Sequence, residues 1–366
     1  MLFIHNDVVA DILTMADCIA AQEAAFRELA EGRAAHRPRS DIYAPCERDD
    51  GYYRWGTMEG TSGGYLAIRM KSDVITWPRD EDGNWTEDKY CVTPGTYCGL
   101  IMLFSTANGE PLAIINDGVL QHMRVGGGAG IGVKYLAREN ARTVGLLGSG
   151  GMARSYLRAF SEVRPIRRVR VYSPTRENRE RFAKEMSFRL NIEIQAVDSP
   201  EEIYPEADIV SSCTDAMAPT IEAELLAPGM HVTMLGPAEI SDAVIARCDV
   251  KITQGASGLR LPEGAGAREG IGHSPLAFVA GTEDERRRLP PKEKSKGFRV
   301  EFPDFCDLVT GRAEGRSDDG QITFYHNIGN QGLQFSSIGT VVYEKAKQKG
   351  VGRRLPTEWF LQDIRD

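Results

Sequence analysis

A glycine-rich turn between an apolar segment and a helical one constrains this chain most. The apolar segment 143–147 is followed directly by a G-x-G-x-x-A pattern, made of Gly148, Ser149, Gly150, Gly151, Met152 and Ala153. In such a pattern the first glycine permits a tight turn, the second lets a pyrophosphate approach the backbone, and the alanine lets a helix pack closely on a strand. A glycine pattern alone also fits a purely structural strand-to-helix turn. A second strand ending about 25 residues later completes a βαβ unit, and this context favours a dinucleotide site.

The residues beyond 140 alternate regularly between strand-like and helix-like segments. Strands are expected at 143–147, 169–172, 192–197, 209–213, 231–235 and 250–253, with helices at 152–162 and 177–190. Strands separated by helix-length segments are typical of a parallel, doubly wound sheet. The sequence therefore predicts an α/β fold with a Rossmann-type domain over residues 126–321.

The beginning of the chain has a different pattern. Apolar positions at helical spacing predict a helix or a helix pair within 7–31, and short apolar runs divided by Gly, Pro and Asp predict an antiparallel sheet over 52–106. A strand at 112–116 and, near the other end, a strand at 322–325 and a helix at 335–347 complete the expected elements. We assign residues 1–125 to a smaller α+β domain to which 322–366 return, and residues 255–300 to a long loop or insertion.

The helix expected at 119–138 contains five glycines between Gly126 and Gly132. Glycine lowers helix stability because its unfolded backbone has more freedom to lose. So many glycines in one helix predict close packing against another backbone or a ligand.

The end of the second nucleotide-domain strand bears on the choice of cofactor. A site that prefers NAD usually offers an acidic residue there, but this chain has Ser173, Thr175 and Arg176, which suit a 2′-phosphate. NADP is therefore the favoured cofactor and NAD the alternative, since Arg176 also fits an exposed charge in a first helical turn. Thr214, directly after the strand at 209–213, is assigned to the same cofactor site.

Composition excludes several other classes of protein. The 366 residues carry a net charge of −8, which disfavours nucleic-acid binding because counterion release needs a basic face. The seven cysteines form no CxxC pair, which fits reduced thiols and predicts neither a disulfide framework nor a metal site. No segment has the roughly 18 apolar residues of a membrane span, and the first residues lack the pattern of a signal peptide. We expect a cytoplasmic protein with a small-molecule partner.

Three cations outside the nucleotide fold stand in structured contexts. They are Arg39 after Pro38, Lys71 in an apolar strand, and Arg124 at the start of the glycine-rich helix. An arginine fork matches a carboxylate bidentately, and a lysine near an electrophilic carbon supplies charge or a proton. Each of them also fits a surface or ion-pair role, although Arg124 is expected to point towards a cleft between the domains.

Four segments together carry a resemblance that covers nearly the whole chain. They are 109–118, Met123-Arg124, 132–140 and 144–154. In order and spacing they resemble the ornithine cyclodeaminase and mu-crystallin family. The resemblance implies a Rossmann domain, a substrate domain built from both chain ends, and a dimer formed through that second domain. It also implies that Lys71, Arg124 and Arg39 hold the substrate carboxylate.

Two departures from that family bear on the chemistry. Cyclodeaminases place an aspartate beside the substrate amine, where this chain has Ala238 followed by Glu239. Glu239 is a candidate catalytic carboxylate. The alternative, equally supported, is that Glu239 is a solvated loop residue without a catalytic role. Gln334 stands where relatives often have aspartate. We therefore expect a divergent member with its own substrate.

Three functions remain open at this stage. An NAD(P)H-dependent reductase or dehydrogenase of a small imino acid, ketimine or amino acid needs a carboxylate clamp and a proton donor, which Arg39, Arg124 and Lys71 supply. An ornithine cyclodeaminase-like lyase also needs a carboxylate to orient the attacking amine, so the missing aspartate favours the reductase. The third possibility is a non-catalytic binding protein of the mu-crystallin type. His122 is either a proton relay beside Arg124 or a residue satisfied by backbone.

Overall fold

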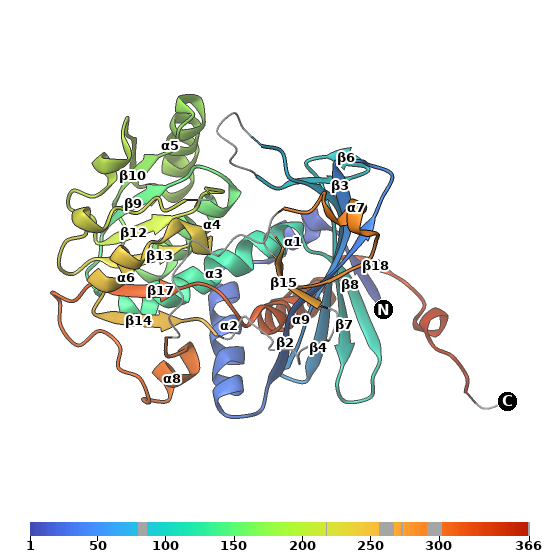
Figure 1. The fold of residues 1–366 in the computed structure, drawn as a ribbon. Coiled ribbons are helices and arrows are strands. Elements are labelled where there is room, and N and C mark those ends of the chain that lie inside the picture. The colour runs from blue at the N-terminus through green and yellow to red at the C-terminus, as the bar shows by residue number, and fades with distance from the viewer. Residues whose placement is uncertain (80–85, 217, 256–266, 272–273, 291–301, 365–366) are drawn as a thin grey trace.

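The computed structural model describes residues 1–364 except 80–85, 217, 256–266, 272–273 and 291–301. Two domains lie side by side, each built on its own β-sheet, and helix α3 (Gly118–Leu136) runs from one to the other (Figure 1). Among the described helices, none combines the length and the apolar composition that crossing a bilayer requires.

The first of the two sheets has seven strands, and every neighbouring pair in it is parallel. In spatial order the strands are β11 (Glu193–Ala196), β10 (Arg168–Tyr172), β9 (Thr143–Leu147), β12 (Ile209–Ser212), β13 (His231–Met234), β17 (Thr323–His326) and β14 (Val250–Thr253). The helices of this domain include α4 (Gly151–Val163), α5 (Arg176–Leu190) and α6 (Asp242–Arg247). The predicted doubly wound sheet is confirmed, and six of its strands lie where the sequence placed them.

Strand β17 corrects the predicted domain boundary. The sequence pattern assigned everything from residue 322 to the other domain, but Thr323–Tyr325 pairs with β13 and Thr323–His326 pairs with β14 in the parallel sheet. Phe324 at its centre is fully buried. The chain therefore returns to the other domain only after His326. A four-residue strand carries no sequence feature that identifies the sheet it joins.

The second sheet has eleven strands and is mainly antiparallel, as predicted. Its main path is β15 (Ala267–Ile271), β16 (Ser274–Val279), β2 (Ala35–Pro45), β3 (Gly51–Ser62), β4 (Tyr65–Thr76), β7 (Cys98–Ser105), β8 (Pro111–Asn116), β1 (Leu2–Ile4) and β18 (Arg353–Arg354), with β5 (Asp88–Cys91) and β6 (Thr93–Pro94) beside β4. Helices α1 (Asn6–Ile12), α2 (Met15–Ala30) and α9 (Gln331–Lys349) share an apolar core with one face of this sheet.

The segment predicted as a long loop contributes two of these strands. β15 and β16 form an antiparallel hairpin, and β16 pairs in parallel with β2 at Asp41–Tyr43. The rest of the predicted insertion, residues 256–266 and 291–301, lies outside the described residues. Its glycine-rich flanks obscured the hairpin. Of the predicted loop or insertion over 255–300, the loop is therefore wrong for 267–271 and 274–279, and the insertion stays a prediction.

Helix α9 crosses β3 at a point where two backbones nearly touch. A Cβ atom added at Gly332 of α9 would lie 1.8 Å from the Glu59 carbonyl oxygen, and one added at Gly60 would lie 2.4 Å from the carbonyl carbon of Gly332. Both neighbouring atoms are backbone, so neither can move aside cheaply. The helix therefore depends on glycine at this crossing.

This crossing gives a test of packing within a single helix. Gly332→Ala is expected to lower the free energy of unfolding by at least ~2 kcal/mol, because overpacking against backbone forces the helix off the sheet. Gly339→Ala, also in α9, places its Cβ 3.7 Å from the nearest atom and is expected to be neutral or to stabilise by up to ~1 kcal/mol through helix propensity. Urea unfolding of both variants measures the difference. Equal effects would contradict this account of the crossing.

Helix α3 confirms the prediction made from its glycines. A Cβ at Gly126 would lie 2.3 Å from Ser155 Oγ on α4, and one at Gly132 would lie 2.3 Å from the Tyr325 ring on β17. On the side of the other domain, a Cβ at Gly127 would lie 2.4 Å from Gln22 Nε2 on α2, so the glycines let α3 approach elements of both domains closely. Its first turns consequently connect the eleven-stranded sheet to the dinucleotide turn.

Candidate active site

A row of residues across the eleven-stranded sheet defines the candidate site. Asp41, Gly56, Lys71 and Gly99 are successive partners on β2, β3, β4 and β7. A Cβ at Gly56 would lie 2.2 Å from the Asp41 carboxylate, and one at Gly99 would lie 1.9 Å from that of Asp117. Glycine on each side of Lys71 therefore makes room for carboxylates that reach in from neighbouring elements.

Lys71 is a buried lysine whose pKa lies near neutrality. Its side chain is about nine-tenths buried; Nζ lies 3.1 Å from Asp73 Oδ2 and 4.7 Å from the centre of the Tyr97 ring. Burial lowers the pKa of Lys71 from 10.5 to about 7, and the positive charge of Arg54 acts in the same direction, while Asp73 opposes them. A lysine with a pKa near neutrality can donate or accept a proton under physiological conditions.

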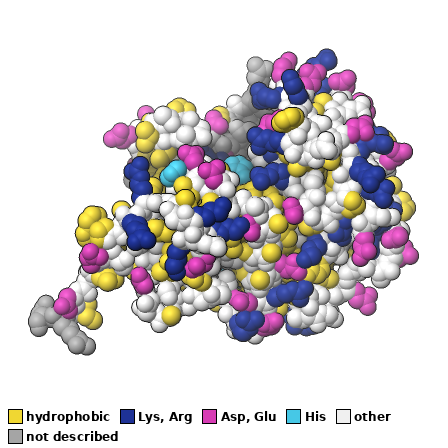
Figure 2. All heavy atoms as spheres, turned by 180° about the vertical axis from the view of Figure 1, so that it is seen from behind, with side chains coloured by type: hydrophobic (Ala, Val, Ile, Leu, Met, Phe, Trp, Pro, Cys, Tyr) yellow, Lys and Arg dark blue, Asp and Glu magenta, His cyan; other side chains and the backbone are white. Residues whose placement is uncertain are grey.

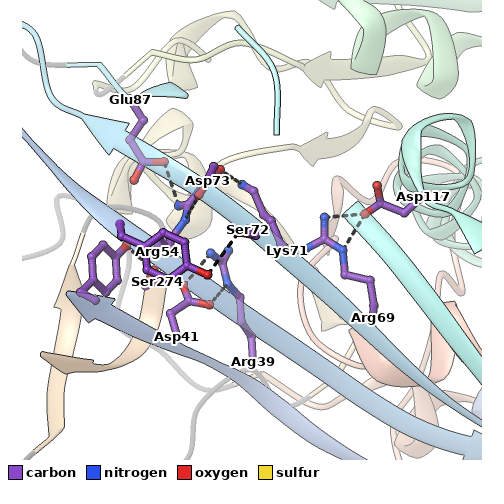
Figure 3. A network of polar contacts seen from close by, with 12 residues as sticks. Arg39, Asp41, Arg54, Arg69, Lys71, Ser72, Asp73, Glu87, Asp117 and Ser274 are labelled. Carbon is purple, nitrogen blue, oxygen red and sulfur yellow. Dashed lines mark hydrogen bonds and ion pairs between the residues drawn. The ribbon is translucent and has the colours of Figure 1, made fainter. Parts of the chain in front are cut away.

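The carboxylate beside Lys71 is itself held by a buried arginine. Arg54 Nε and Nη2 donate to the two oxygens of Asp73 at 2.9 and 2.7 Å, and Arg54 Nη1 lies 3.7 Å from Glu87 Oε2 (Figure 3). The arginine is 1% exposed and Asp73 is 2% exposed. This bidentate pair fixes Asp73, and the position of the Lys71 ammonium follows from it.

Arg39, the second predicted substrate residue, lies close to the first. Its Nε and Nη2 donate to Asp41 at 3.0 and 2.6 Å, and Asp41 is fully buried. Ser274 on β16 also donates to Asp41, which brings the unexpected hairpin into the same network (Figure 3). Arg39 is thus compensated by a carboxylate of its own strand.

Two aromatic rings separate the remaining cations. Arg69 of β4 donates to Asp117 at 2.6 Å, and its guanidinium carbon lies 5.7 Å from the Tyr97 ring centre and 5.4 Å from that of Phe335. The Phe335 ring, on α9, has Arg124 at 5.2 Å. The order Lys71, Tyr97, Arg69, Phe335, Arg124 is therefore a chain of alternating cations and rings, with cation–π attraction at each step.

Arg124 differs from the other cations in its partners. Its Nε and Nη2 donate to Gln121 Oε1 at 3.2 and 3.1 Å, and its Nη1 donates to Gln334 Oε1 at 3.0 Å. Gln334 is itself fixed, because its amide nitrogen donates to Gln22 Oε1 at 2.6 Å. Within the part of the chain that the structure describes, no carboxylate forms an ion pair with Arg124.

Neutral partners have an electrostatic consequence for this guanidinium. Burial, followed by the charge of Arg69, lowers the pKa of Arg124 to about 10, so it stays protonated at neutral pH. A buried positive charge with only amide partners attracts an anion that can share the site. Gln334 in place of the family's aspartate keeps that charge available.

The predicted dinucleotide turn has the required geometry. Gly148 has a φ of +99°, and its Cβ would lie 2.3 Å from the Cys213 carbonyl oxygen, so only glycine fits there. At Gly150, which caps the N-terminus of α4, an added Cβ would meet nothing within 4 Å. Ala153 is fully buried. Open space at the second glycine and close packing at the alanine fit a pyrophosphate on the helix N-terminus.

The other predicted cofactor residues lie around this turn. Ser173 Oγ lies 2.8 Å from Ser149 Oγ, and a Cβ at Gly148 would lie 3.4 Å from Thr214 Cγ2. Thr175 is the N-cap residue of α5 and makes no side-chain capping bond. Arg176 is exposed and pairs with Glu180 at 2.7 Å. The first three are therefore near the turn, and Arg176 extends into solvent from the next helix.

Glu239 has a structural task that the sequence did not predict. It is fully buried, and its Oε1 accepts from Ser212 Oγ and from both the backbone nitrogen and the hydroxyl of Thr214, at 2.6 to 2.7 Å. Its Oε2 accepts from the backbone nitrogens of Leu235 and Gly236 at 2.9 and 2.7 Å. Five donors occupy the carboxylate, so it ties together the loops after β12 and β13. The solvated-loop alternative is wrong, because the side chain is fully buried, and the catalytic role stays a prediction that five hydrogen bonds disfavour.

His122 lies on helix α3 between Arg124 and the dinucleotide turn. Its Nδ1 lies 3.0 Å from the Gly118 carbonyl oxygen, and its Nε2 would lie 2.8 Å from a Cβ at Gly151. The ring therefore rests on the first residue of α4, two positions along α3 from Arg124. The bond to Gly118 fits the predicted satisfaction by backbone.

Several charged residues of this network were not identified from the sequence. They are Asp41, Arg54, Arg69, Asp73 and Asp117. One feature could have revealed part of the set, since Arg69, Lys71 and Asp73 stand at every second position of an otherwise apolar strand and so share one face. The partners on other strands depend on register, which the sequence does not show.

The fold and site define a two-domain α/β protein in which helix α3 carries His122 against a dinucleotide-type turn and Arg124 into a buried cluster of cations. The chain belongs to the ornithine cyclodeaminase/mu-crystallin family, whose model matches residues 1–350. The expected family is thereby confirmed.

Individual relatives agree with this assignment. A Δ1-pyrroline-2-carboxylate reductase of Bacillus cereus is 28% identical over 265 residues, 71% of this chain and 74% of that protein. An alanine dehydrogenase of Archaeoglobus fulgidus is 27% identical over 357 residues, 97% and 98% of the two chains. The solved structure of Thermococcus litoralis Δ1-pyrroline-2-carboxylate reductase in complex with NADH and L-proline has a TM-score of 0.71 at 21% identity, covering 97% of this chain and 100% of that one. The last likeness establishes the shared fold.

Proposed function

We propose that this chain is an NAD(P)H-dependent reductase or dehydrogenase of a small imino acid, ketimine or amino acid. The observation that carries the proposal is one cluster that holds both a buried lysine, with a pKa of about 7, and a buried arginine whose hydrogen bonds go only to amides. The named relatives reduce pyrroline-2-carboxylate or dehydrogenate alanine, which fits a substrate with a carboxylate next to the reacting carbon.

Each residue has a separate part in this proposal. The nicotinamide cofactor, when bound at the Gly148–Ala153 turn, supplies or accepts the hydride. Arg124 binds the substrate carboxylate, with Arg39 at the far end of the polar network, and the Lys71 ammonium donates a proton to the nitrogen as the imine is reduced. Tyr97 and Phe335 shield these charges from water, which strengthens their interaction with the substrate.

Initial rates test the proposal. Purified protein with NADPH or NADH and a panel of cyclic imino acids, or of 2-oxo acids with ammonia or methylamine, is followed at the absorbance band of the reduced nicotinamide. We expect consumption of the reduced cofactor that depends on an imine bearing a carboxylate. If the same imines without the carboxylate react equally well, the assigned role of Arg124 is wrong.

The pH dependence of the reaction tests the role of Lys71. Because the ammonium is the proton donor, kcat/KM for imine reduction is expected to fall as pH rises through about 7, and oxidation of the amino acid to rise over the same interval. Asp73 stabilises the ammonium, so Asp73→Asn is expected to move the inflection to lower pH. Rate profiles from pH 5 to 9 (about two units either side of the inflection) measure this; an unmoved inflection would exclude Lys71 as the titrating group.

For the cofactor we propose NADP over NAD. Asp198, a described carboxylate near the end of β10, pairs with Arg179, while Ser173, Thr175 and the exposed Arg176 follow β10, where an NAD site usually offers an acidic residue. Arg176→Ala is expected to raise KM for NADPH about 10-fold or more, as loss of a charged hydrogen bond does, and to leave KM for NADH within about twofold. Arg181→Ala on the same helix is the matched control. Equal effects on both cofactors would favour NAD.

A cyclodeaminase reaction is the second candidate, because the family includes such enzymes. The saturated carboxylate of Glu239 disfavours it, since no oxygen is left for the attacking amine. Ammonia release from ornithine with NAD, without net change in the cofactor, would support this lyase instead. If neither cofactor consumption nor ammonia release is detected, a non-catalytic binding protein of the mu-crystallin type is favoured.

We also propose that the enzyme is a cytoplasmic homodimer. The sheet face opposite α9 carries half-exposed apolar side chains at alternate positions, among them Trp55, Ile68, Met70, Leu100 and Met102. Ile42 on the same sheet is 51% exposed. An apolar face of this extent is typical of an interface with another protein. One solved structure with the same fold is described as an archaeal alanine dehydrogenase dimer.

A further inference from the structure

A short segment beyond the part matched by the family model leaves the body of the protein. It follows β18 and contains the 3₁₀ turn η4 (Thr357–Phe360), which projects away from both domains (Figure 1). Seen from behind, the projection is again separate from the rest of the surface, on which basic and acidic side chains intermingle (Figure 2). We call residues 356–364 the arm.

The start of the arm is firmly anchored. Strand β18 pairs with β1, and Leu355 N donates to the Met1 carbonyl at 2.9 Å. The Met1 nitrogen donates to the Leu355 carbonyl at 3.1 Å and to Thr357 Oγ1 at 2.8 Å. Hydrogen bonds to the backbone N–H and carbonyl of Leu355 and to the Thr357 hydroxyl therefore fix the direction in which the arm leaves.

The arm exposes large apolar side chains that the described residues of its own chain leave largely uncovered. Trp359 is 71% exposed, Leu361 59% and Ile364 92%, and Phe360 is 42% exposed. These are four of the ten large apolar residues exposed in the described chain. A buried aromatic side chain typically covers about 150–250 Å², so an uncovered cluster of this kind is a strong driving force for association.

A hollow that suits these side chains lies at the base of the arm. It has a volume of about 370 Å³, and its lining combines the charged side chains of Glu110, Lys347 and Arg354 with apolar walls from Leu2, Leu112, Tyr343, Ala346, Val351 and Leu355. Leu355 is both part of the wall and the last residue before the arm. In a dimer with a twofold axis near this edge of the sheet, each arm starts beside its own hollow and extends over that of the other copy.

We propose that the arm of one copy packs its aromatic turn into this hollow on a second copy. The exchange rests on the homodimer put forward above, places its twofold axis near the edge formed by β1 and β18, and adds a contact outside the part matched by the family model. It predicts that the dimer is tighter than the sheet face alone would make it.

Site-specific photocrosslinking tests the exchange in the full-length protein. The residue p-benzoylphenylalanine is placed at Trp359, and the matched control carries it at Phe188, which is 90% exposed on α5. Illumination is expected to give a covalent dimer from the Trp359 variant only, with the crosslinked peptides containing residues 110–112 or 343–355. A crosslink within one chain, or no crosslink above that of the control, would overturn the proposal.

Loss of the arm gives a second measurement. A chain ending at Leu355 keeps both sheets and is expected to self-associate at least about 10-fold more weakly in sedimentation, as removal of interface aromatic residues commonly does. Unchanged self-association would contradict the exchange. Neither experiment depends on turnover, so a protein that crosslinks but reduces no imine would disprove the proposed reaction and leave the arm exchange standing.

Discussion

Lys71→Met is expected to lower kcat/KM for imine reduction by about 10²- to 10⁴-fold, the usual contribution of a positioned general acid. Methionine keeps the length of the side chain and removes the proton and the charge. Asp73 retains its bidentate partner Arg54, so the buried network keeps a compensated core. The loss is therefore expected in the chemical step and not in folding.

Two measurements separate these effects for Lys71. The melting temperature and the affinity for the reduced cofactor are expected to stay close to those of the parent protein. Lys349→Met, at the exposed end of α9, is the matched control and should leave the rate unchanged. A Lys71→Met enzyme within about threefold of the parent rate would mean that another group or water supplies the proton.

Arg124→Ala is expected to raise KM for the imino acid by about 30-fold or more, corresponding to at least ~2 kcal/mol for one member of a buried charged pair. The guanidinium has no carboxylate partner among the described residues, so removing it leaves no buried anion behind. Stability should consequently fall little, in contrast to what removal of Arg54 or Arg69 would do.

The dependence of this loss on the substrate identifies its cause. A substrate amide, which lacks the charge of the carboxylate, should react equally slowly with the parent enzyme and with Arg124→Ala. Arg189→Ala, an exposed arginine on α5, serves as the control. An equal rise in KM for acid and amide would show that Arg124 shapes the site without binding the carboxylate.

Local patterns were sufficient to predict the parallel-sheet domain. Its strands alternate with helices at short spacing, and the Gly148–Ala153 turn has one geometry compatible with its sequence. The exception was β17, which enters between β13 and β14 after a long excursion. A pairing between strands far apart in the chain depends on tertiary packing and leaves no periodic pattern.

The sequence was sufficient to single out three cations as candidate site residues, but not to predict the side chains that surround them. Lys71, Arg124 and Arg39 stood out as charged residues in apolar or structured contexts. The structure links Lys71 to Arg124 through alternating rings and cations and pairs Arg39 with Asp41 nearby. Whether each cation is compensated depended on side chains from other elements, such as Asp41 for Arg39 and Gln334 for Arg124. For Glu239 the sequence suggested a catalytic acid, but the carboxylate is buried and accepts five hydrogen bonds that hold two loops together.

The transfer of hydride to carbon is the central claim, and deuterium labelling measures it directly. Reduced cofactor carrying deuterium at the transferable position is incubated with the protein and the imino acid that gives the highest rate, and the amino acid product is analysed by mass spectrometry. Hydride transfer to the imine carbon predicts a product with a single deuterium on the carbon next to the carboxylate, formed in step with oxidation of the cofactor. An unlabelled product, or ammonia released from a diamino acid while the cofactor stays reduced, would contradict it.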